Sequence, residues 1–442
     1  MRIGLLGNMN NNFFALMRYF RDLGADAHLM LYDNDGVGNL AHFRPEDDTW
    51  HLARWQPYIH QTGLQNGPLG GAALPWAVAQ YLKTLLRGGV PGAQRWPRLA
   101  LANPVRRALA PYEVLLGTGV APALAARGGR ALDGFFPYAC GIEFVASPED
   151  HPRLTRGGWL RRSIYRSTAH AQIAGLRRTR VCFNADMGLT ATTFESLGIP
   201  FRALALPMVY NREAVNLSRA SEPLHHALDK MGQAGFRIVA HARHHWRQPA
   251  THAAKDWHQE NKHNDWLIRA FAQLVQLRPT REPLLVLLEY GKDVEASRAL
   301  CQDLGIADRV LWMPKRPRRE IMVLLEACDL GVGEFLLPPG TLWGGTGWEV
   351  LAAGRPLMHG FPFGEGAFER ALGHPPPPLL AVQREEDVLA GLLAAADDPG
   401  AMARIGRDSG AWFERHNGIG LARHWLEALH PPQATRPGAR TS

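Results

Sequence analysis

A glycine-rich turn and the short helix expected after it form the stretch of this sequence best suited to chemistry. The turn reads Trp-Gly-Gly-Thr-Gly over residues 343–347, and Glu349 follows it. Glycines let backbone N–H groups converge on one point, and a helix N-terminus attracts anions, so the turn suits a phosphate. An acid one turn further on can accept hydrogen bonds from ribose hydroxyls. The predicted phosphate and ribose site comprises Gly344, Gly345, Thr346, Gly347 and Glu349.

Two glycine motifs also have purely structural interpretations. Thr346 can cap the helix, with Glu349 on a solvated face, because glycine-rich turns before helices are common. Gly-Thr-Gly at 117–119 lacks the third glycine and the downstream acid of a dinucleotide-binding motif, so we interpret it as a turn that lines a cleft.

Histidines gather between residues 241 and 263, and imidazole is a common metal ligand. His241 and His245 are four residues apart, but we expect a strand end and a loop there, and no nearby acid completes a zinc site. We therefore predict no metal. Contacts to a phosphate or to an acceptor are the favoured role for these histidines.

Length and composition indicate an ordinary globular protein of two domains. The chain has 442 residues, of which 46% are hydrophobic and 20% charged, and one core rarely holds so many. The net charge of +8 indicates attraction to polyanions, whether nucleic acid, anionic lipid or phosphorylated substrates. The polar, proline-broken stretch 431–442 is expected to be a disordered tail.

Cysteine usage and hydropathy point to the cytoplasm. The four cysteines are far apart and form no C-x-x-C pair, which is typical of structural thiols in a reducing compartment. We find neither a secretory signal nor an uncharged apolar run long enough to span a bilayer. The cysteines are Cys140, Cys182, Cys301 and Cys328.

Apolar runs alternate with amphipathic helical patterns in the first half of the chain, as in a parallel α/β sheet. A strand at 3–6 precedes a helix over 13–20, and the next strand is expected at 27–31. Further strands are expected at 113–116 and 132–136. Loops after such strands form the ligand crevice of an open sheet.

A second series of the same kind follows a polar linker at 211–223. Strands are expected at 236–240, 284–288, 310–313 and 329–332, and helices at 265–277 and 319–327. The sequence thus predicts two Rossmann-like domains, 1–215 and 224–410, that face a cleft. A last helix, 411–430, either packs back on the first domain or belongs to the second.

The order and spacing of these segments resemble the GT-B glycosyltransferases, in particular the retaining family 4 type, which use nucleotide-diphosphate sugars. The segments that carry the resemblance are 3–33, 137–143, 241–243, 262–271, 329–356 and 397–399. The resemblance implies that the first domain binds the acceptor and the second the sugar nucleotide. It also implies that no metal or other cofactor is required.

The resemblance assigns catalytic roles to Arg243, Lys262 and Glu349. Arg243 matches the family's arginine after the first strand of the second domain, and Lys262 matches the lysine that opens the next helix. In the family these cations hold the donor diphosphate, which agrees with the general chemistry of an arginine fork and a lysine charge. Glu349 matches the second acid of a Glu-x7-Glu motif, and Gly344 its internal glycine.

The first acid of that motif is absent, because Thr341 occupies its position. Glu334 lies upstream in a longer loop, so Thr341 and Glu334 are both candidates for contact with the donor sugar. The interval from Arg243 to Lys262 is also longer than usual. Two alternatives therefore stay open, a GT-B module that binds nucleotides without catalysis and a sugar-nucleotide epimerase.

The first domain offers four candidate contacts to the acceptor or the phosphate, three in its first loop and one acid further on. Gly7, Asn8 and Asn10 lie where the family's first loop approaches the donor phosphate, and asparagines there can donate to an anion or to an acceptor hydroxyl. Asparagines also simply build turns, which is the alternative. Glu143 is placed to accept from a sugar hydroxyl, and an ordinary surface acid is the alternative.

Arginines between 153 and 180 surround Trp159, Ile164 and Tyr165. A basic helix with an apolar face suits docking on an anionic membrane, and a solvated helix packed on the sheet is the alternative. Nucleic acid is not expected, because no reader motif or stacking array appears. We thus predict a cytoplasmic retaining hexosyltransferase that acts on a glycan or other hydroxyl acceptor. If the acceptor is lipid-linked, we expect the enzyme to bind peripherally to the inner face of the membrane.

Overall fold

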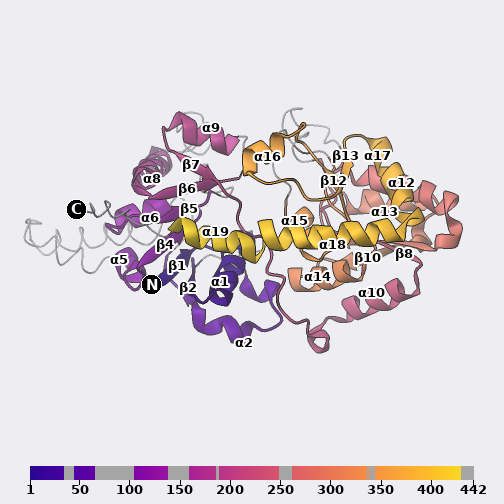
Figure 1. Ribbon diagram of the computed structural model, residues 1–442, viewed down its shortest axis with the longest axis horizontal. Helices are drawn as coiled ribbons and strands as arrows, with labels where there is room; N and C mark the ends of the chain where they lie inside the picture. The colour runs from indigo at the N-terminus through magenta and orange to yellow at the C-terminus, as the bar shows by residue number, and fades with distance from the viewer. Residues whose placement is uncertain are drawn as a thin grey trace, which may run out of the picture.

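The computed structural model describes residues 1–33, 44–64, 104–137, 159–185, 189–247, 261–335, 337 and 344–429, without the side chains of 160–165 and 189. Two parallel β-sheets, each flanked by helices, form the two lobes of Figure 1. The predicted architecture of two Rossmann-like domains is confirmed. Glu143, Thr341 and the tail at 431–442 lie outside the described residues.

The first domain holds a seven-stranded sheet of order β3-β2-β1-β4-β5-β6-β7. Its inner strands are mostly buried and apolar, as a parallel sheet covered by helices requires, whereas the edge strands β3 and β7 are partly exposed. The strands are β1 (Arg2–Leu6), β2 (Asp26–Leu31), β3 (Ile59–Gln61), β4 (Val114–Gly117), β5 (Gly134–Phe135), β6 (Val181–Asn184) and β7 (Phe201–Ala203). The described helices are α1 (Asn12–Asp22), α2 (Leu52–Trp55), α5 (Pro104–Leu109), α6 (Ala121–Arg127), α8 (Trp159–Arg178) and α9 (Leu189–Ser196), with a 3-10 turn η3 (Pro45–Asp48).

The second domain holds a six-stranded sheet of order β10-β9-β8-β11-β12-β13. Its strands are β8 (Phe236–Ala240), β9 (Pro283–Glu289), β10 (Val310–Pro314), β11 (Leu330–Val332), β12 (Leu357–Gly360) and β13 (Leu380–Val382). Its helices are α10 (Glu222–Gln233), α12 (Asn264–Leu277), α13 (Val294–Asp303), α14 (Arg318–Ala327), α15 (Gly345–Ala352), α16 (Ala367–Leu372) and α17 (Glu385–Asp397). Because α10 begins at Glu222, the connection between the domains is slightly shorter than the linker expected at 211–223.

Two helices at the end of the chain run from the second domain to the first (Figure 1). The helix expected at 411–430 is divided, because α18 (Pro399–His416) ends before Asn417 and α19 (Ile419–Leu429) follows. Trp425 of α19 is fully buried against Phe183 of the first domain, with ring centroids 4.2 Å apart. Burying a large aromatic ring in this way stabilises the contact between α19 and the first domain.

The strand order reverses direction at one point in each sheet. This point lies between β1 and β4 in the first domain and between β8 and β11 in the second. Loops that leave the C-terminal ends of such strands diverge to opposite faces and leave a crevice, where α/β proteins bind ligands. A ligand site is therefore expected at the loops after β1, β8 and β11.

Candidate functional site

A cavity of about 440 Å³ lies between the two domains at these strand ends. The first domain contributes the loop after β1 and the turn η3 to its lining. The second domain contributes the loops after β8, β9, β10 and β11 and the start of α15. The lining residues with polar side chains include Asn10, Asn11, Asp47, His241, Arg243, Lys262, Lys315, Arg316, Arg318, Glu334, Thr346 and Glu349.

Arg243 and Lys262, the two predicted phosphate ligands, line the same cavity but differ in their surroundings. Arg243 is exposed and has no ion-pair partner in the described part of the chain. Lys262 is largely buried, and its Nζ donates to Oε2 of Glu334 across 2.5 Å. Of these two cations, Arg243 thus lacks a counter-charge among the described residues, whereas Lys262 is paired.

The glycine-rich turn starts α15 at the edge of the cavity, as the pattern predicts. Gly344 is the N-cap residue and Thr346 is already inside the helix, so the interpretation of Thr346 as the cap is wrong. The Oγ1 atom of Thr346 is buried and has no hydrogen-bond partner among the described residues. A buried hydroxyl without a partner is unfavourable, which is consistent with a place reserved for a ligand oxygen.

Glu349 is buried rather than solvated, with an exposed fraction of 6%. Its Oε1 accepts from Nε of Arg318, and its Oε2 is bonded to Nε2 of His241, both at 2.6 Å. Burial alone would raise the pKa of Glu349, but the Arg318 guanidinium and the His241 ring lower it to about 2. Glu349 is therefore a carboxylate at neutral pH and accepts hydrogen bonds only.

Arg318, at the start of α14, is a central residue of the cavity that sequence reasoning missed. Its Nη1 donates to Oδ1 of Asp48 at 2.9 Å and to the backbone oxygen of Asn10 at 2.8 Å, both in the first domain. Asp48 lies 270 positions away along the chain, so no local pattern marks this contact. The basic run at 315–319 was the one available signal.

Comparison with known proteins identifies the fold. No protein-family model and no curated protein matches the sequence. Among solved structures, Anabaena Alr3699/HepE in complex with UDP superposes with a TM-score of 0.54 at 14% identity, over 97% of this chain and 99% of that one. The chain has the GT-B fold. A glycosyltransferase from Rickettsia africae (TM-score 0.53, 11% identity, 97% of each chain) and sucrose-phosphate synthase from Thermosynechococcus elongatus (0.51, 14%, 97% and 98%) agree.

The first loop of the GT-B fold places its three candidates differently. Asn10 lines the interdomain cavity, whereas Gly7 and Asn8 are not part of its described lining. Asn8 is buried, and its Oδ1 accepts from the backbone nitrogen of Phe14 in α1 at 3.0 Å. Gly7 has a φ of +95°, and a Cβ there would lie 2.8 Å from Cγ2 of Thr118. Gly7 and Asn8 thus build the turn that presents Asn10.

Only one of the described histidines near the start of the second GT-B domain lines the cavity. His241 does so, while His244 is buried against Ser297, and burial lowers the pKa of His244 to about 4. Within the described residues, no three histidine, cysteine or acidic side chains are grouped to hold a metal ion. None of the described helices has the length and apolar character that a bilayer crossing requires.

Proposed function

We propose that this chain is a glycosyltransferase that moves a sugar from a nucleotide-diphosphate sugar to an acceptor hydroxyl. The observation that supports it is the gathering of Arg243, Lys262, the start of α15 and Glu349 around one interdomain cavity. The two cations and the start of α15 belong to segments that are far apart in the sequence, since Gly345 follows Lys262 by 83 positions. Their chemistry matches a diphosphate and a ribose.

The diphosphate would bind between the two cations and the first turn of α15. Arg243 is exposed and offers a planar fork of donors, which suits bidentate contact with phosphate oxygens. Lys262 adds a point charge, and the helix terminus adds backbone N–H groups. Such preorganised positive charge stabilises the nucleoside diphosphate as it leaves, the step that most needs it.

The ribose would bind to Glu349. Each carboxylate oxygen of Glu349 holds one protein donor and keeps lone pairs for a further one. Because its pKa is low, the carboxylate stays charged, and a charged acceptor makes the stronger hydrogen bond to a hydroxyl.

The sugar would be transferred with retention at the anomeric carbon. Departure of the diphosphate would precede attack by the acceptor, and a phosphate oxygen would take the acceptor proton, so no protein nucleophile is required. Glu334, next to Lys262, is the proposed contact for donor-sugar hydroxyls, together with Thr341. Asn10 and Glu143 are the proposed acceptor contacts in the first domain.

The first donor to test is a UDP-sugar. The structures of Anabaena Alr3699/HepE are complexes with UDP, with UDP and glucose, and with UDP-glucose. We propose the same class of donor here on the grounds of the shared fold and the cavity described above.

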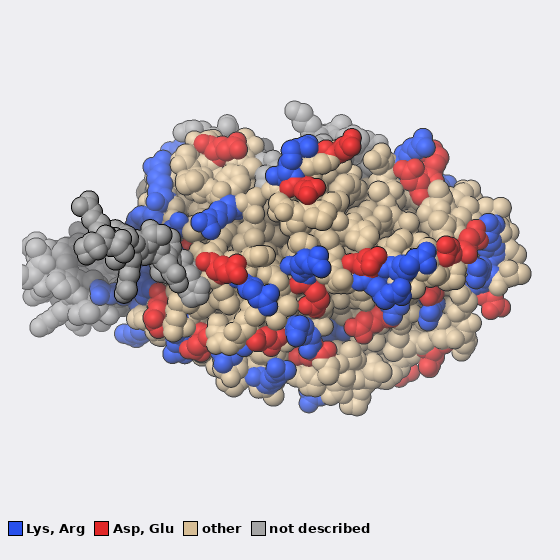
Figure 2. Space-filling view, in the orientation of Figure 1, with Lys and Arg blue, Asp and Glu red and all other residues tan. Residues whose placement is uncertain are grey.

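We further propose that the acceptor is lipid-linked and that the protein works at the cytoplasmic face of a membrane. Figure 2 shows lysine and arginine side chains gathered at the edge of the first domain over α8. Arg166, Arg177 and Arg178 of α8 are exposed, and Trp159 at its start is 75% exposed. Basic side chains beside an exposed aromatic ring suit an anionic lipid surface.

The deciding experiment incubates the protein with UDP-, GDP- and ADP-sugars and follows slow hydrolysis of the donor by chromatography. Release of free sugar with its anomeric configuration retained supports the proposal. Binding without hydrolysis or transfer would indicate a nucleotide-binding module instead, and a free epimer would indicate an epimerase. Absence of any binding would refute all three.

A further inference from the structure

Four charged side chains of alternating sign, each at most 15% exposed, form a row across the boundary between the domains. Nη2 of Arg18 lies 2.6 Å from Oδ2 of Asp48, and Oδ1 of Asp48 lies 2.9 Å from Nη1 of Arg318. Nε of Arg318 lies 2.6 Å from Oε1 of Glu349, which completes the row. The side chains of Arg18 and Asp48 are at most 2% exposed, so water screens this row little.

The boundary between the domains cuts this row in its middle. Arg18 of α1 and Asp48 of η3 belong to the first domain, whereas Arg318 of α14 and Glu349 of α15 belong to the second. If the domains separate, the Asp48–Arg318 contact breaks and each domain keeps one neutral ion pair. An unpaired buried charge is strongly unfavourable. Breaking the row at Asp48–Arg318 leaves no charge unpaired, so separation of the domains costs far less free energy than it would if the boundary split one of the two end pairs.

The contacts of Arg318 connect the first domain directly to the ribose acid of the proposed site. One guanidinium edge, Nε, holds Glu349, while Nη1 holds Asp48 and the backbone oxygen of Asn10. A planar guanidinium has donors in fixed directions, so fixing one edge orients the other. Docking of the first domain therefore fixes the direction from which Arg318 holds Glu349.

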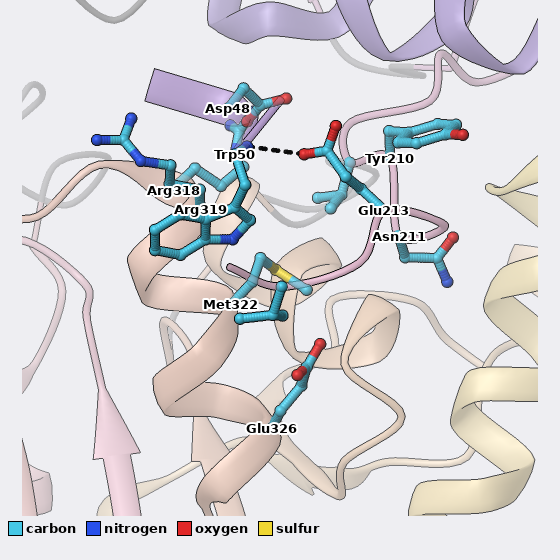
Figure 3. Close-up of a pocket in the computed structure, with 11 residues that line it drawn as sticks. Asp48, Trp50, Tyr210, Asn211, Glu213, Arg318, Arg319, Met322 and Glu326 are labelled. Atoms are coloured by element: carbon cyan, nitrogen blue, oxygen red, sulfur yellow. Dashed lines mark hydrogen bonds and ion pairs between the residues drawn. The ribbon is translucent and has the colours of Figure 1, made fainter. Parts of the chain in front are cut away.

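We propose that Arg318 is a positioning residue that couples docking of the two domains to ribose binding by Glu349. The ribose part of this inference depends on the proposed function, whereas the docking part does not. Figure 3 shows Arg318 and Arg319 on the same helix, facing the segment that carries Asp48 and Trp50. Arg319 also bonds to the first domain, through the backbone oxygen of Glu46, but has no contact with Glu349. It offers a matched control.

The test compares wild-type protein with the variants Arg318→Met, Arg318→Lys and Arg319→Met. Calorimetry measures binding of UDP, GDP and ADP, of the 2′,3′-dideoxy form of the one that binds best, and of inorganic pyrophosphate. Small-angle scattering without ligand measures the radius of gyration. Circular dichroism checks folding, and Arg318→Lys keeps a cation in place should Arg318→Met fail to fold.

We expect Arg318→Met to weaken nucleoside diphosphate binding at least about fivefold, a usual size for coupling between sites, and to leave pyrophosphate binding unchanged. The loss of affinity that the dideoxy form suffers in the wild type should disappear, and the radius of gyration should rise. Arg318→Lys should show the same ligand pattern, because an ammonium cannot hold both carboxylates in a fixed geometry. Arg319→Met should keep the ribose dependence of the wild type.

Three results would overturn the inference. The first is unchanged nucleoside diphosphate binding in Arg318→Met, and the second is an equal loss of pyrophosphate binding, which would mean that Arg318 touches the phosphates. The third is the same ligand pattern in Arg319→Met, which would make the effect a general one of domain contact. If the wild type binds no nucleotide, the proposed function fails, and scattering alone still decides whether Arg318 holds the domains together.

Discussion

Lys262 and Glu334, which follow different strands of the second sheet, form an ion pair of 2.5 Å inside the interdomain cavity. The pair comes from the loop after β8 and the end of β11, where the strand order of the sheet reverses. In the proposed complex a diphosphate competes with Glu334 for the same ammonium group.

Replacing Glu334 by glutamine should therefore strengthen diphosphate binding. Removal of the competing carboxylate leaves Lys262 available, and we expect pyrophosphate to bind about threefold more tightly or better, which corresponds to roughly 0.7 kcal/mol. Titration calorimetry at fixed salt measures this. Glu289→Gln is the control, since Glu289 pairs with Arg298 and is not part of the described cavity lining. Weaker binding in Glu334→Gln alone would show that Glu334 orients Lys262 instead of competing for it.

Replacing Arg243 by alanine should remove affinity without loss of stability. The side chain is exposed and has no ion-pair partner among the described residues, so the melting temperature should stay within about 1 °C of the wild type. Binding of UDP should fall about 10- to 100-fold, because hydrogen bonds to charged groups contribute about 1.5–3 kcal/mol. The exposed Arg247 lies in the same loop but outside the described lining, and Arg247→Ala should bind normally. If both variants bind UDP with equal affinity, Arg243 is not part of the binding site.

Replacing Thr346 by valine should raise stability slightly while it lowers affinity. Valine has nearly the same shape and removes a buried hydroxyl that lacks a partner, so the free energy of unfolding should rise by up to about 1 kcal/mol. A bound diphosphate would lose one hydrogen bond, and its affinity should fall about two- to tenfold. Urea denaturation and calorimetry measure the two effects, and Thr346→Ser should keep the affinity. A loss of stability in Thr346→Val would mean that the hydroxyl has a structural role.

The loss of stability between pH 4.5 and 2 should depend on Glu349. Its pKa drops from an ordinary 4.5 to about 2 on folding, because Arg318 and His241 outweigh the opposing effect of burial. A group whose pKa is lower in the folded state contributes fully to the free energy of unfolding above its unfolded pKa. It loses that contribution as the pH falls through the folded pKa. The window is therefore pH 4.5 to 2, and the contribution is on the order of 3 kcal/mol.

The comparison variant for this prediction is Glu349→Gln, which cannot ionise. The difference in unfolding free energy between wild type and variant should be largest near neutral pH and should shrink as the pH approaches 2. Urea denaturation at intervals from pH 7 to 2.5 measures it. A difference that stays constant with pH would show that Glu349 does not titrate in this window.

Gly7 should tolerate alanine much less than Gly24 does. Both have positive φ, +95° and +84°, but a Cβ at Gly7 would lie 2.8 Å from Thr118 and 2.9 Å from Tyr32, whereas at Gly24 it meets nothing within 4 Å. We expect a loss of about 1 kcal/mol for Gly24→Ala from backbone strain alone and about 2–3 kcal/mol for Gly7→Ala. Thermal and urea unfolding of both variants test this ranking, and equal losses would contradict it.

The elements that the sequence predicts well are those fixed by neighbouring residues. The strand Phe236–Ala240 has the predicted bounds, because a short apolar run between polar residues is a local signal. The strand expected at 132–136 is real but shorter, Gly134–Phe135, and next to it the Asp133 carboxylate accepts from the backbone nitrogen of Leu115. Local pattern locates a strand better than it locates its ends.

The contacts of the cavity depend on distant residues and were less predictable. Sequence reasoning placed Glu349 near a ribose but did not identify Arg318 or Asp48, whose contact joins residues 270 positions apart. It left the role of Asn8 open, and only the turn geometry shows that this side chain holds the start of α1. Partners brought together by the tertiary fold leave no periodic trace in the sequence.

In the part of the chain that the structure describes, two segments connect the domains, and they are in contact at Asn417. The side chain of Asn417, at the break between α18 and α19, donates to the backbone oxygen of Leu206 and accepts from the backbone nitrogen of Met208. These two hydrogen bonds hold the two interdomain connections together at one point. A displacement of one domain against the other therefore has to keep these two segments together at Asn417 or break both hydrogen bonds.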